Sequence, residues 1–323
     1  MRAYITFMRP FTMMPPMLGV ISGALTAWGS RHSPREGFGF DEIMLILIAS
    51  LAAGFLNAAS NGVNQIYDLE IDRINKPNRP LVTGALTIRQ AGIFTAFLYI
   101  ICVSVTWIVV PTPGLDWYGR LTAPLFSHEC IVFYLLAAIF TLIYSVPQFG
   151  RTKRLTLGAN LTMATPRGLM LKVAGWSVLA SIWAWEPWYI GLCFFLFVLG
   201  AASTKDFSDM DGDRRGGCNT LPIRFGVRKA AYMIAPFFIL PWLLIPLGIV
   251  IKPDGVEPIL SGDPVLLLIF AGTLIAWGSY TVYLILRDPE ALSRMENHPS
   301  WKHMYLMMIW AQIGFALAYL IRI

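Results

Sequence analysis

Apolar residues recur in long runs along the whole chain, separated by short polar stretches. A helix needs about 20 residues to cross the hydrocarbon core of a bilayer. The runs predict nine spans with these approximate ends: Phe11–Trp28, Ile43–Val63, Ala91–Val110, Ile131–Val146, Leu161–Trp185, Trp188–Ser203, Ala230–Ile251, Val265–Leu286 and Met304–Ile321. The pattern therefore predicts an all-α polytopic membrane bundle of nine transmembrane helices, forming one domain over residues 1–323.

Composition supports a membrane protein. The 323 residues are 56% hydrophobic and 14% charged, and the mean hydropathy is +0.60. A soluble domain of this size could not bury that much apolar surface. The first apolar run lacks a clear small-residue cleavage site, so we take it as an uncleaved helix. The four cysteines are scattered without metal-ligand spacing, and buried small hydrophobic residues explain them better than a metal site.

Basic residues indicate the orientation. If the N-terminus is cytoplasmic, the segments predicted to lie inside are 1–10, 64–90, 147–160, 204–229 and 287–303. They carry 18 of the 25 lysines and arginines, the outer segments carry 5, and 2 fall inside the fifth span. Cytoplasmic loops of membrane proteins are enriched in this way. The net charge of +6 is explained by this bias, so we expect membrane lipid around the chain and no nucleic-acid partner.

Two short segments, 64–72 and 206–213, hold seven of the nineteen acidic residues. Carboxylates are costly near a bilayer, so their presence there suggests a function. One segment follows the second span and the other follows the sixth, 141 residues later. The even number of spans between them puts both at the cytoplasmic face. We therefore expect two pseudo-repeated four-helix halves, with the site between them.

Within these segments the acidic residues follow helical spacing. Asn64, Asp68 and Asp72 are spaced i, i+4, i+8, and Asp209 and Asp213 repeat the spacing. Side chains at these intervals share one helix face. Mg²⁺ binds carboxylates while leaving positions for substrate phosphates. The pattern predicts metal ligands, and hence catalytic residues, at Asp68, Asp72, Asp209 and Asp213.

Neighbouring residues have weaker predicted roles. Asn64 and Asp206, the latter one turn before Asp209, are expected to support the metal and substrate. Gly212 is expected to let the second helix end. Carboxylates that merely solvate helix ends are the alternative interpretation, and it suits Glu70 and Asp211, which point off the shared face.

Basic residues surround both segments. They are Arg73, Lys76 and Arg79 after the first, Lys205, Arg214, Arg215 and Arg224 around the second, and Arg151, Lys153 and Arg154 between them. A diphosphate carries about three negative charges, which Arg and Lys side chains can bind. We expect Arg79, Lys153, Lys205 and Arg214 to contact it, while other basic residues set topology. Arg167 and Lys172 lie inside a span, where a charge suggests function. We expect Arg167, which is nearer the cytoplasmic side, to bind substrate.

The residues of both segments resemble the motifs of the UbiA superfamily of intramembrane prenyltransferases. The first match is Asn64–Asp72, continued by Arg73–Pro80 and Thr83-Gly84. The second is Lys205–Asp213 with Thr220-Leu221-Pro222. Arg9-Pro10, Tyr144-Ser145 and Lys153-Arg154 also match family positions. The resemblance covers nearly the whole chain.

The resemblance implies Mg²⁺-dependent transfer of a polyprenyl group from a polyprenyl diphosphate donor to a small acceptor. It implies that Arg9 and Tyr144 bind substrate, Arg9 through an acceptor carboxylate or phosphate, unless it only anchors the first helix. Gln65 and Arg167-Gly168-Leu169 are similar to homogentisate prenyltransferases. We therefore expect a homogentisate- or hydroxybenzoate-like aromatic acceptor, in quinone and prenyl-lipid biosynthesis.

Other acceptors are also consistent with the motifs. Lys205–Asp213 with Thr220-Leu221-Pro222 also resembles the synthases that act on a glycerol phosphate in ether-lipid formation, and Met14–Met17 resembles chlorophyll synthases, which use a chlorophyllide. A cation-coupled transporter is the alternative of a different class, because acids and a repeat also suit ion pathways. The acids cluster at one membrane face and not at the midplane, which argues against it.

Overall fold

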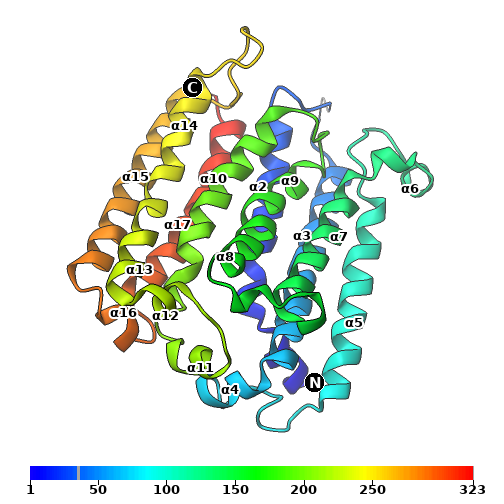
Figure 1. Cartoon of the computed structure of the whole chain (residues 1–323). Coiled ribbons are helices and arrows are strands. Elements are labelled where there is room, and N and C mark those ends of the chain that lie inside the picture. The colour runs from blue at the N-terminus through cyan, green and yellow to red at the C-terminus, as the bar shows by residue number, and fades with distance from the viewer. Residues whose placement is uncertain (35–36, 323) are drawn as a thin grey trace.

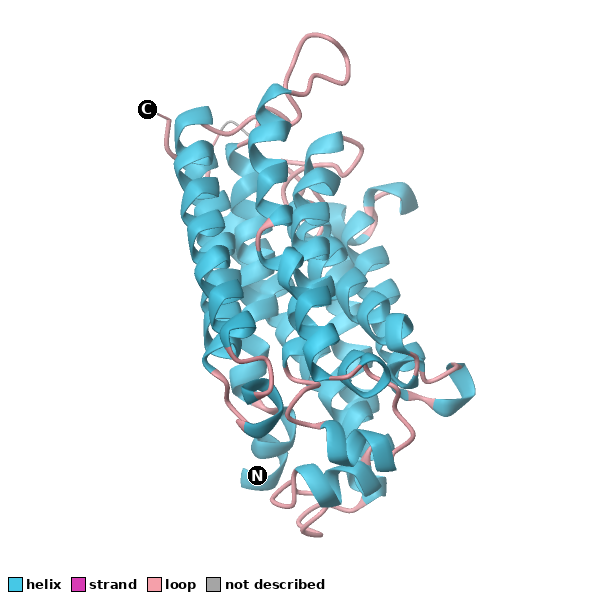
Figure 2. Ribbon diagram, turned by 60° about the vertical axis from the view of Figure 1, so that its left-hand side comes forward, coloured by secondary structure: helices cyan, strands magenta, loops and turns pink. Residues whose placement is uncertain are grey.

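The computed structural model describes residues 1–34 and 37–322. Within these ranges every regular element is helical (Figure 2). The α-helices are α1 (Arg2–Met8), α2 (Met14–Gly29), α3 (Phe40–Tyr67), α4 (Leu69–Asn75), α5 (Ile88–Ser104), α6 (Trp117–Leu121), α7 (Glu129–Ser145), α8 (Thr156–Ala164), α9 (Leu171–Trp176), α10 (Trp185–Ala201), α11 (Met210–Arg215), α12 (Leu221–Phe225), α13 (Val227–Ile234), α14 (Leu240–Val250), α15 (Pro264–Arg287), α16 (Ala291–Arg294) and α17 (Pro299–Leu320). The prediction of an all-α protein is confirmed.

Six helical segments of the described chain are long and apolar enough to cross a membrane. They are Phe40–Tyr67, Ile88–Ile108, Trp185–Thr204, Val227–Val250, Pro264–Arg287 and Pro299–Leu320. The other three predicted spans fall on the shorter helices α2 and α7 and on α8 to α9, which the π-helix η6 (Thr165–Met170) interrupts. The protein is an integral membrane protein, while nine crossings and two repeated halves stay predictions.

Helix α2 occupies the middle of the bundle and packs against α3, α9 and α17 (Figure 1). Gly23 makes one of these contacts possible. A Cβ atom at Gly23 would lie 2.8 Å from the Cα atom of Gly175 and 2.9 Å from the carbonyl oxygen of Lys172. Small residues let membrane helices approach closely, so backbones can gain dispersion contacts where lipid offers no hydrophobic driving force.

Both acidic segments lie at the same end of the bundle. Helices α4 and α11 are neighbours there, close to the N-terminus, whereas the C-terminus lies at the other end (Figure 1). We call the end that carries α4 and α11 the motif end. The placement confirms that residues far apart in sequence share one face of the bundle.

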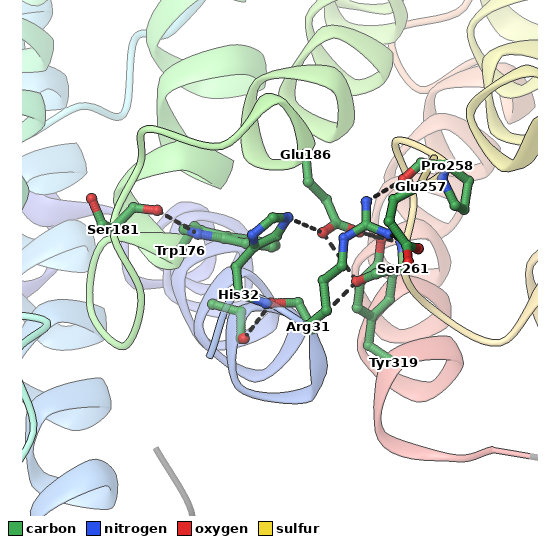
Figure 3. Close-up of polar contacts among 11 residues, drawn as sticks. Arg31, His32, Trp176, Ser181, Glu186, Glu257, Pro258, Ser261 and Tyr319 are labelled. Carbon is green, nitrogen blue, oxygen red and sulfur yellow. Dashed lines mark hydrogen bonds and ion pairs between the residues drawn. The ribbon is translucent and has the colours of Figure 1, made fainter. Parts of the chain in front are cut away.

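The opposite end is held by a polar network around the buried carboxylate of Glu186 (Figure 3). This carboxylate accepts hydrogen bonds from the Ser261 backbone N–H at 2.5 Å, the Ser261 hydroxyl at 3.0 Å and the Tyr319 hydroxyl. The Nε2 atom of His32 lies 3.4 Å away. The contacts join the ends of α2, α10 and α17 and the loop before α15. Buried polar groups are stable when they are hydrogen-bonded in this way.

Candidate active site

A cavity of about 370 Å³ opens between the helices at the motif end. Its walls come from α3, α4, α7, α8, α10 and α17, so they combine segments from the whole length of the chain. Six predicted oxygen donors line it: Asn64, Asp68, Asp72, Asp206, Asp209 and Asp213. The structure therefore brings both acidic segments to one cavity.

The first acidic segment keeps its helical register across a break. Helix α3 ends at Tyr67, and Asp68 joins it to α4 with a non-helical φ of −105°. The backbone N–H of Asp68 still bonds to the carbonyl of Asn64 at 2.9 Å, and that of Asp72 to the carbonyl of Asp68 at 2.7 Å. The i, i+4, i+8 spacing therefore still directs the three side chains to one face.

The second acidic segment forms a short helix that lies against the first. Asp209 precedes α11, and the backbone N–H of Asp213 bonds to its carbonyl at 3.1 Å. The expectation that the helix ends at Gly212 is wrong, because α11 continues to Arg215. Gly212 instead permits contact with α4, since a Cβ atom there would lie 2.3 Å from the Oδ1 atom of Asn75. The glycine serves close approach between helices.

Basic side chains hold three of the carboxylates. Asp68 pairs with the buried Lys153 and with Arg151, whose Nη2 atom is 3.1 Å from Oδ1. Asp72 pairs with Arg79. The Oδ1 atom of Asp209 lies 3.5 Å from the Nζ atom of Lys76.

Two carboxylates remain without such a partner. Among the described residues, neither Asp206 nor Asp213 has a basic side chain within ion-pair distance. Burial, followed by the repulsion of Asp209, raises the pKa of Asp213 to about 7. Burial and the charges of Asp213 and Asp209 raise the pKa of Asp206 well above its usual range. Both carboxyl groups therefore favour the neutral form until a cation compensates their charge.

The donor set is chemically suited to Mg²⁺, which prefers carboxylate oxygens. Because the carboxylates repel one another, a divalent cation among them would lower the energy of their charged forms. In the arrangement described here, no three His, Cys, Asp or Glu side chains are grouped to share one ion within residues 1–34 and 37–322. Asp68, Asp72 and Asp209 face ammonium or guanidinium groups instead.

The remaining predicted residues divide into two sets. Cavity walls include Arg9, Arg79, Tyr144, Lys153, Arg167 and Lys205. Arg214 is exposed and lies outside the cavity wall, so its position does not support a diphosphate contact. Lys172 also lies outside it, because its Nζ atom donates to the Ser22 hydroxyl at 2.6 Å and lies 4.9 Å from the Phe194 ring centroid. We interpret Lys172 as a link between helices.

Arg9 reaches the cavity from an unusual backbone position. Its φ of 57° places it in the left-handed region, between α1 and the short helix η1 (Pro10–Met13). Such a conformation is uncommon outside glycine and often marks a functional position. Burial and then the nearby Arg79 lower the pKa of Arg9, and Arg167 adds to the effect. Arg9, Arg79 and Arg167 thus interact electrostatically and line the same cavity.

Two sets of cavity contacts were not assigned from the sequence. Arg151 and Lys76 pair with predicted metal ligands, although spacing alone did not distinguish them from other basic residues. Helix α17 contributes an apolar and aromatic stripe, Trp301, Met304, Tyr305 and Met308. The i, i+3, i+4, i+7 spacing of these residues is visible in the sequence and indicates a buried helix face. Any helix that faces a core shows the same pattern, so the spacing alone does not identify a cavity wall.

A second, mostly apolar cavity of about 80 Å³ adjoins the first. Both share wall residues, including Asn57, Thr141 and Arg167. The smaller cavity extends between α3, α7 and α9 along Phe133 and Met170. A charged chamber thus continues into an apolar one, which suits a ligand with an anionic head and a hydrocarbon tail.

The model of the UbiA prenyltransferase family matches residues 13–309. The chain belongs to this family. It is an enzyme, a UbiA-type prenyltransferase, and the resemblance inferred from the two motifs is confirmed.

Several similar proteins have been characterised or solved. The UbiA chain is 29% identical to the digeranylgeranylglyceryl phosphate synthase of Thermococcus gammatolerans, over 90% of this chain and 89% of the relative. It is 32% identical to a probable chloroplastic homogentisate phytyltransferase 2 of Oryza sativa subsp. japonica, over 70% of this chain and 56% of that one. A UbiA homologue from Archaeoglobus fulgidus bound to DMAPP and Mg²⁺ has a TM-score of 0.67 at 17% identity, covering 97% and 99% of the two chains. That last likeness shows the fold.

Proposed function

We propose that this UbiA enzyme transfers a polyprenyl group from its diphosphate to a glycerol phosphate acceptor in the membrane, forming an ether bond. The observation that carries the proposal is one cavity that holds both acidic segments and, beside them, Arg9 and Arg167 without carboxylate partners among the described residues. The similarity to digeranylgeranylglyceryl phosphate synthases supports the same acceptor. The aromatic acceptor that we expected from the sequence is less well supported, and a chlorophyllide acceptor has no support from these relatives.

The donor diphosphate is proposed to bind between the acidic segments and the basic residues that line the same chamber. Lys153, Arg79 and Lys205 supply positive charge there. Asp68, Asp72, Asp209 and Asp213 are the proposed ligands of Mg²⁺, supported by Asn64 and Asp206. The A. fulgidus homologue bound to DMAPP and Mg²⁺ supports use of a divalent metal. The prenyl chain is proposed to lie in the adjoining apolar cavity.

The proposed reaction breaks the bond between the allylic carbon and the diphosphate oxygen. When bound, the metal would neutralise charge that develops on the diphosphate leaving group. Arg79 and Lys153 would add hydrogen bonds to the same oxygens. The aromatic rings of Tyr144 and Tyr305, both in the cavity wall, would face the allylic cation and exclude water. The acceptor hydroxyl then attacks that carbon, forming the C–O bond, and its proton passes to the released diphosphate.

The acceptor phosphate is proposed to bind Arg9 and Arg167. A phosphate offers enough oxygens to accept bonds from two guanidinium groups. Arg9 and Arg167 line the same cavity, and the charge of Arg167 contributes to the lowered pKa of Arg9. Two nearby guanidinium groups repel each other unless an anion lies between them. This cation pair suits a phosphate dianion better than a single carboxylate.

The orientation is also a proposal. The basic-residue count supports a cytoplasmic N-terminus and a cytoplasmic motif end. We propose that residues 1–323 work as one domain, because the cavity walls draw on helices from α3 to α17. The family match speaks for an enzyme and against the cation-coupled transporter.

The decisive experiment is an acceptor screen with the purified protein in lipid nanodiscs. Geranylgeranyl diphosphate and Mg²⁺ would be supplied with geranylgeranylglyceryl phosphate, homogentisate or 4-hydroxybenzoate, and diphosphate release and product mass would be measured. We expect turnover with the glyceryl phosphate. Preferential turnover with homogentisate would show that the acceptor is aromatic and refute the proposed glycerol phosphate. Ion flux in liposomes without turnover on any acceptor would refute the proposed prenyl transfer.

A further inference from the structure

The loop between α15 and α17 lies at the motif end of the bundle and contacts two lysines of the cavity wall (Figure 1). It contains α16, and the buried Leu292 anchors it to the bundle. Within the loop, an exposed ion pair at 2.9 Å joins Arg294 to Asp288. The loop then turns into α17, whose first turns carry the cavity residues Trp301 and Tyr305. The loop is therefore continuous with one wall of the cavity.

Glu296 in this loop contacts both acidic segments through lysines. Its Oε1 atom lies 3.3 Å from the Nζ atom of Lys76, which follows the first segment. Its backbone carbonyl accepts a hydrogen bond at 3.1 Å from the Nζ atom of Lys205, which begins the second segment. Lys76 and Lys205 both line the cavity. One loop residue therefore holds the ammonium groups of two cavity lysines.

Lys76 is shared between two carboxylates. Its Nζ atom lies 3.5 Å from Oδ1 of Asp209 as well as 3.3 Å from Oε1 of Glu296. Asp209 belongs to the cavity, whereas the side chain of Glu296 is 69% exposed. An exposed ion pair is weak and readily exchanged. Of its two ion pairs, Lys76 therefore loses less free energy by breaking the one with Glu296 than the one with Asp209.

We propose that Glu296 is a positioning residue, a clasp that ties the loop to Lys76 and Lys205 until the donor diphosphate binds these two ammonium groups. The inference rests on the proposed binding of a diphosphate in this cavity. A diphosphate carries about three negative charges and accepts several hydrogen bonds, so it competes well against a single exposed carboxylate. Donor binding would then release the loop from the two lysines.

A kinetic experiment tests the competition between Glu296 and the donor. Glu296→Gln keeps the size of the side chain and the backbone carbonyl but removes the negative charge of the carboxylate. We expect the KM for the polyprenyl diphosphate to fall about two- to fivefold with kcat unchanged, because a weak surface pair contributes about that factor. Glu290→Gln is the matched control, since Glu290 lies in the same loop and none of the described ion pairs involves it. The control should leave KM unchanged.

A second experiment measures the mobility of the loop directly, in the absence of turnover. Hydrogen–deuterium exchange of residues 289–298 would be measured in nanodiscs, with and without inorganic diphosphate and Mg²⁺. We expect diphosphate to speed exchange in the wild-type loop about two- to fivefold. Glu296→Gln should exchange faster than the wild type before diphosphate is added, and diphosphate should speed its exchange less, because only the backbone contact with Lys205 remains to be released. Glu290→Gln should behave like the wild type.

These results separate the clasp from the proposed function. Unchanged exchange in Glu296→Gln, or equal KM changes in both variants, would overturn the clasp. A clasp response to inorganic diphosphate in an enzyme that uses none of the tested acceptors would support the clasp while refuting the proposed acceptor. If diphosphate fails to alter exchange although the enzyme turns over, the clasp is wrong and the proposed function stands.

Discussion

The close approach of α4 and α11 gives a sharp test of how the site is assembled. Gly212→Ala would add a Cβ atom 2.3 Å from Oδ1 and 2.4 Å from Cγ and Nδ2 of Asn75. Carbon atoms in favourable contact are about 3.5–4.0 Å apart. The two helices must therefore separate by about 1 Å, or the Asn75 side chain must rotate and lose its 3.4 Å bond to the Asp209 carbonyl.

Either response moves the second acidic segment relative to the first. Overpacking of this kind costs about 1–3 kcal/mol of stability, and a misplacement of about 1 Å at reacting groups can reduce the rate about 100-fold. We expect Gly212→Ala to lower kcat/KM for the donor roughly 10- to 100-fold while the protein still inserts into the membrane. Diphosphate release and a thermal unfolding assay in nanodiscs would measure the two effects.

A double substitution distinguishes this cause from others. Asn75→Ala removes the side chain that Gly212→Ala would strike, so Gly212→Ala should have little effect in the Asn75→Ala background. Gly272→Ala on α15 is the control, because a Cβ atom there meets nothing within 4 Å. Equal losses from Gly212→Ala in both backgrounds would refute the steric explanation.

Four further predictions address other parts of the molecule. Asp68→Asn and Asp209→Asn should each abolish turnover with normal membrane insertion, because both lose a proposed metal ligand, and an active double variant would show that the metal assignment is wrong. Chelation of divalent ions should stop turnover and added Mg²⁺ should restore it, whereas activity that survives exhaustive chelation would refute metal dependence. Arg167→Gln should raise the acceptor KM roughly 10- to 100-fold, the effect of about 1.5–3 kcal/mol from a charged hydrogen bond, without changing the donor KM, while Arg214→Gln on the exposed surface should change neither. Tyr319→Phe should destabilise the protein by about 1–3 kcal/mol in thermal unfolding, because the buried Glu186 loses a donor, with donor KM unchanged, and a large KM effect would show coupling between the two ends.

Much of the site could be predicted from the sequence because its chemistry is local. The i, i+4 spacing of Asn64, Asp68 and Asp72 fixes their common face, and backbone hydrogen bonds preserve that spacing even where α3 gives way to α4. Repetition of the spacing at Asp209 and Asp213 predicted a shared site, and both segments do line one cavity. The acceptor could not be predicted, because the residues near it resemble several branches of the family.

Predictions from the sequence were wrong or incomplete where they depended on which residues of other helices lie next to a side chain. Gly212 looked like a helix end, and only the position of Asn75 shows that it permits two helices to touch. Arg214 and Lys205 flank the same acidic segment, yet Arg214 is exposed while Lys205 lines the cavity. Lys172 and Arg167 are both charges within one predicted span, and packing against Ser22 and Phe194 turns Lys172 away from the cavity.

Hydropathy and helical periodicity were enough to predict the membrane setting, the all-helical fold and the two acidic segments, because both depend on residues close together in the chain. Tertiary structure decided which cation meets which carboxylate. Lys153 lies 85 residues from Asp68, and Glu296 lies 220 from Lys76. Such pairings follow from the way α2, α3, α10 and α17 pack around one cavity, which no local pattern encodes.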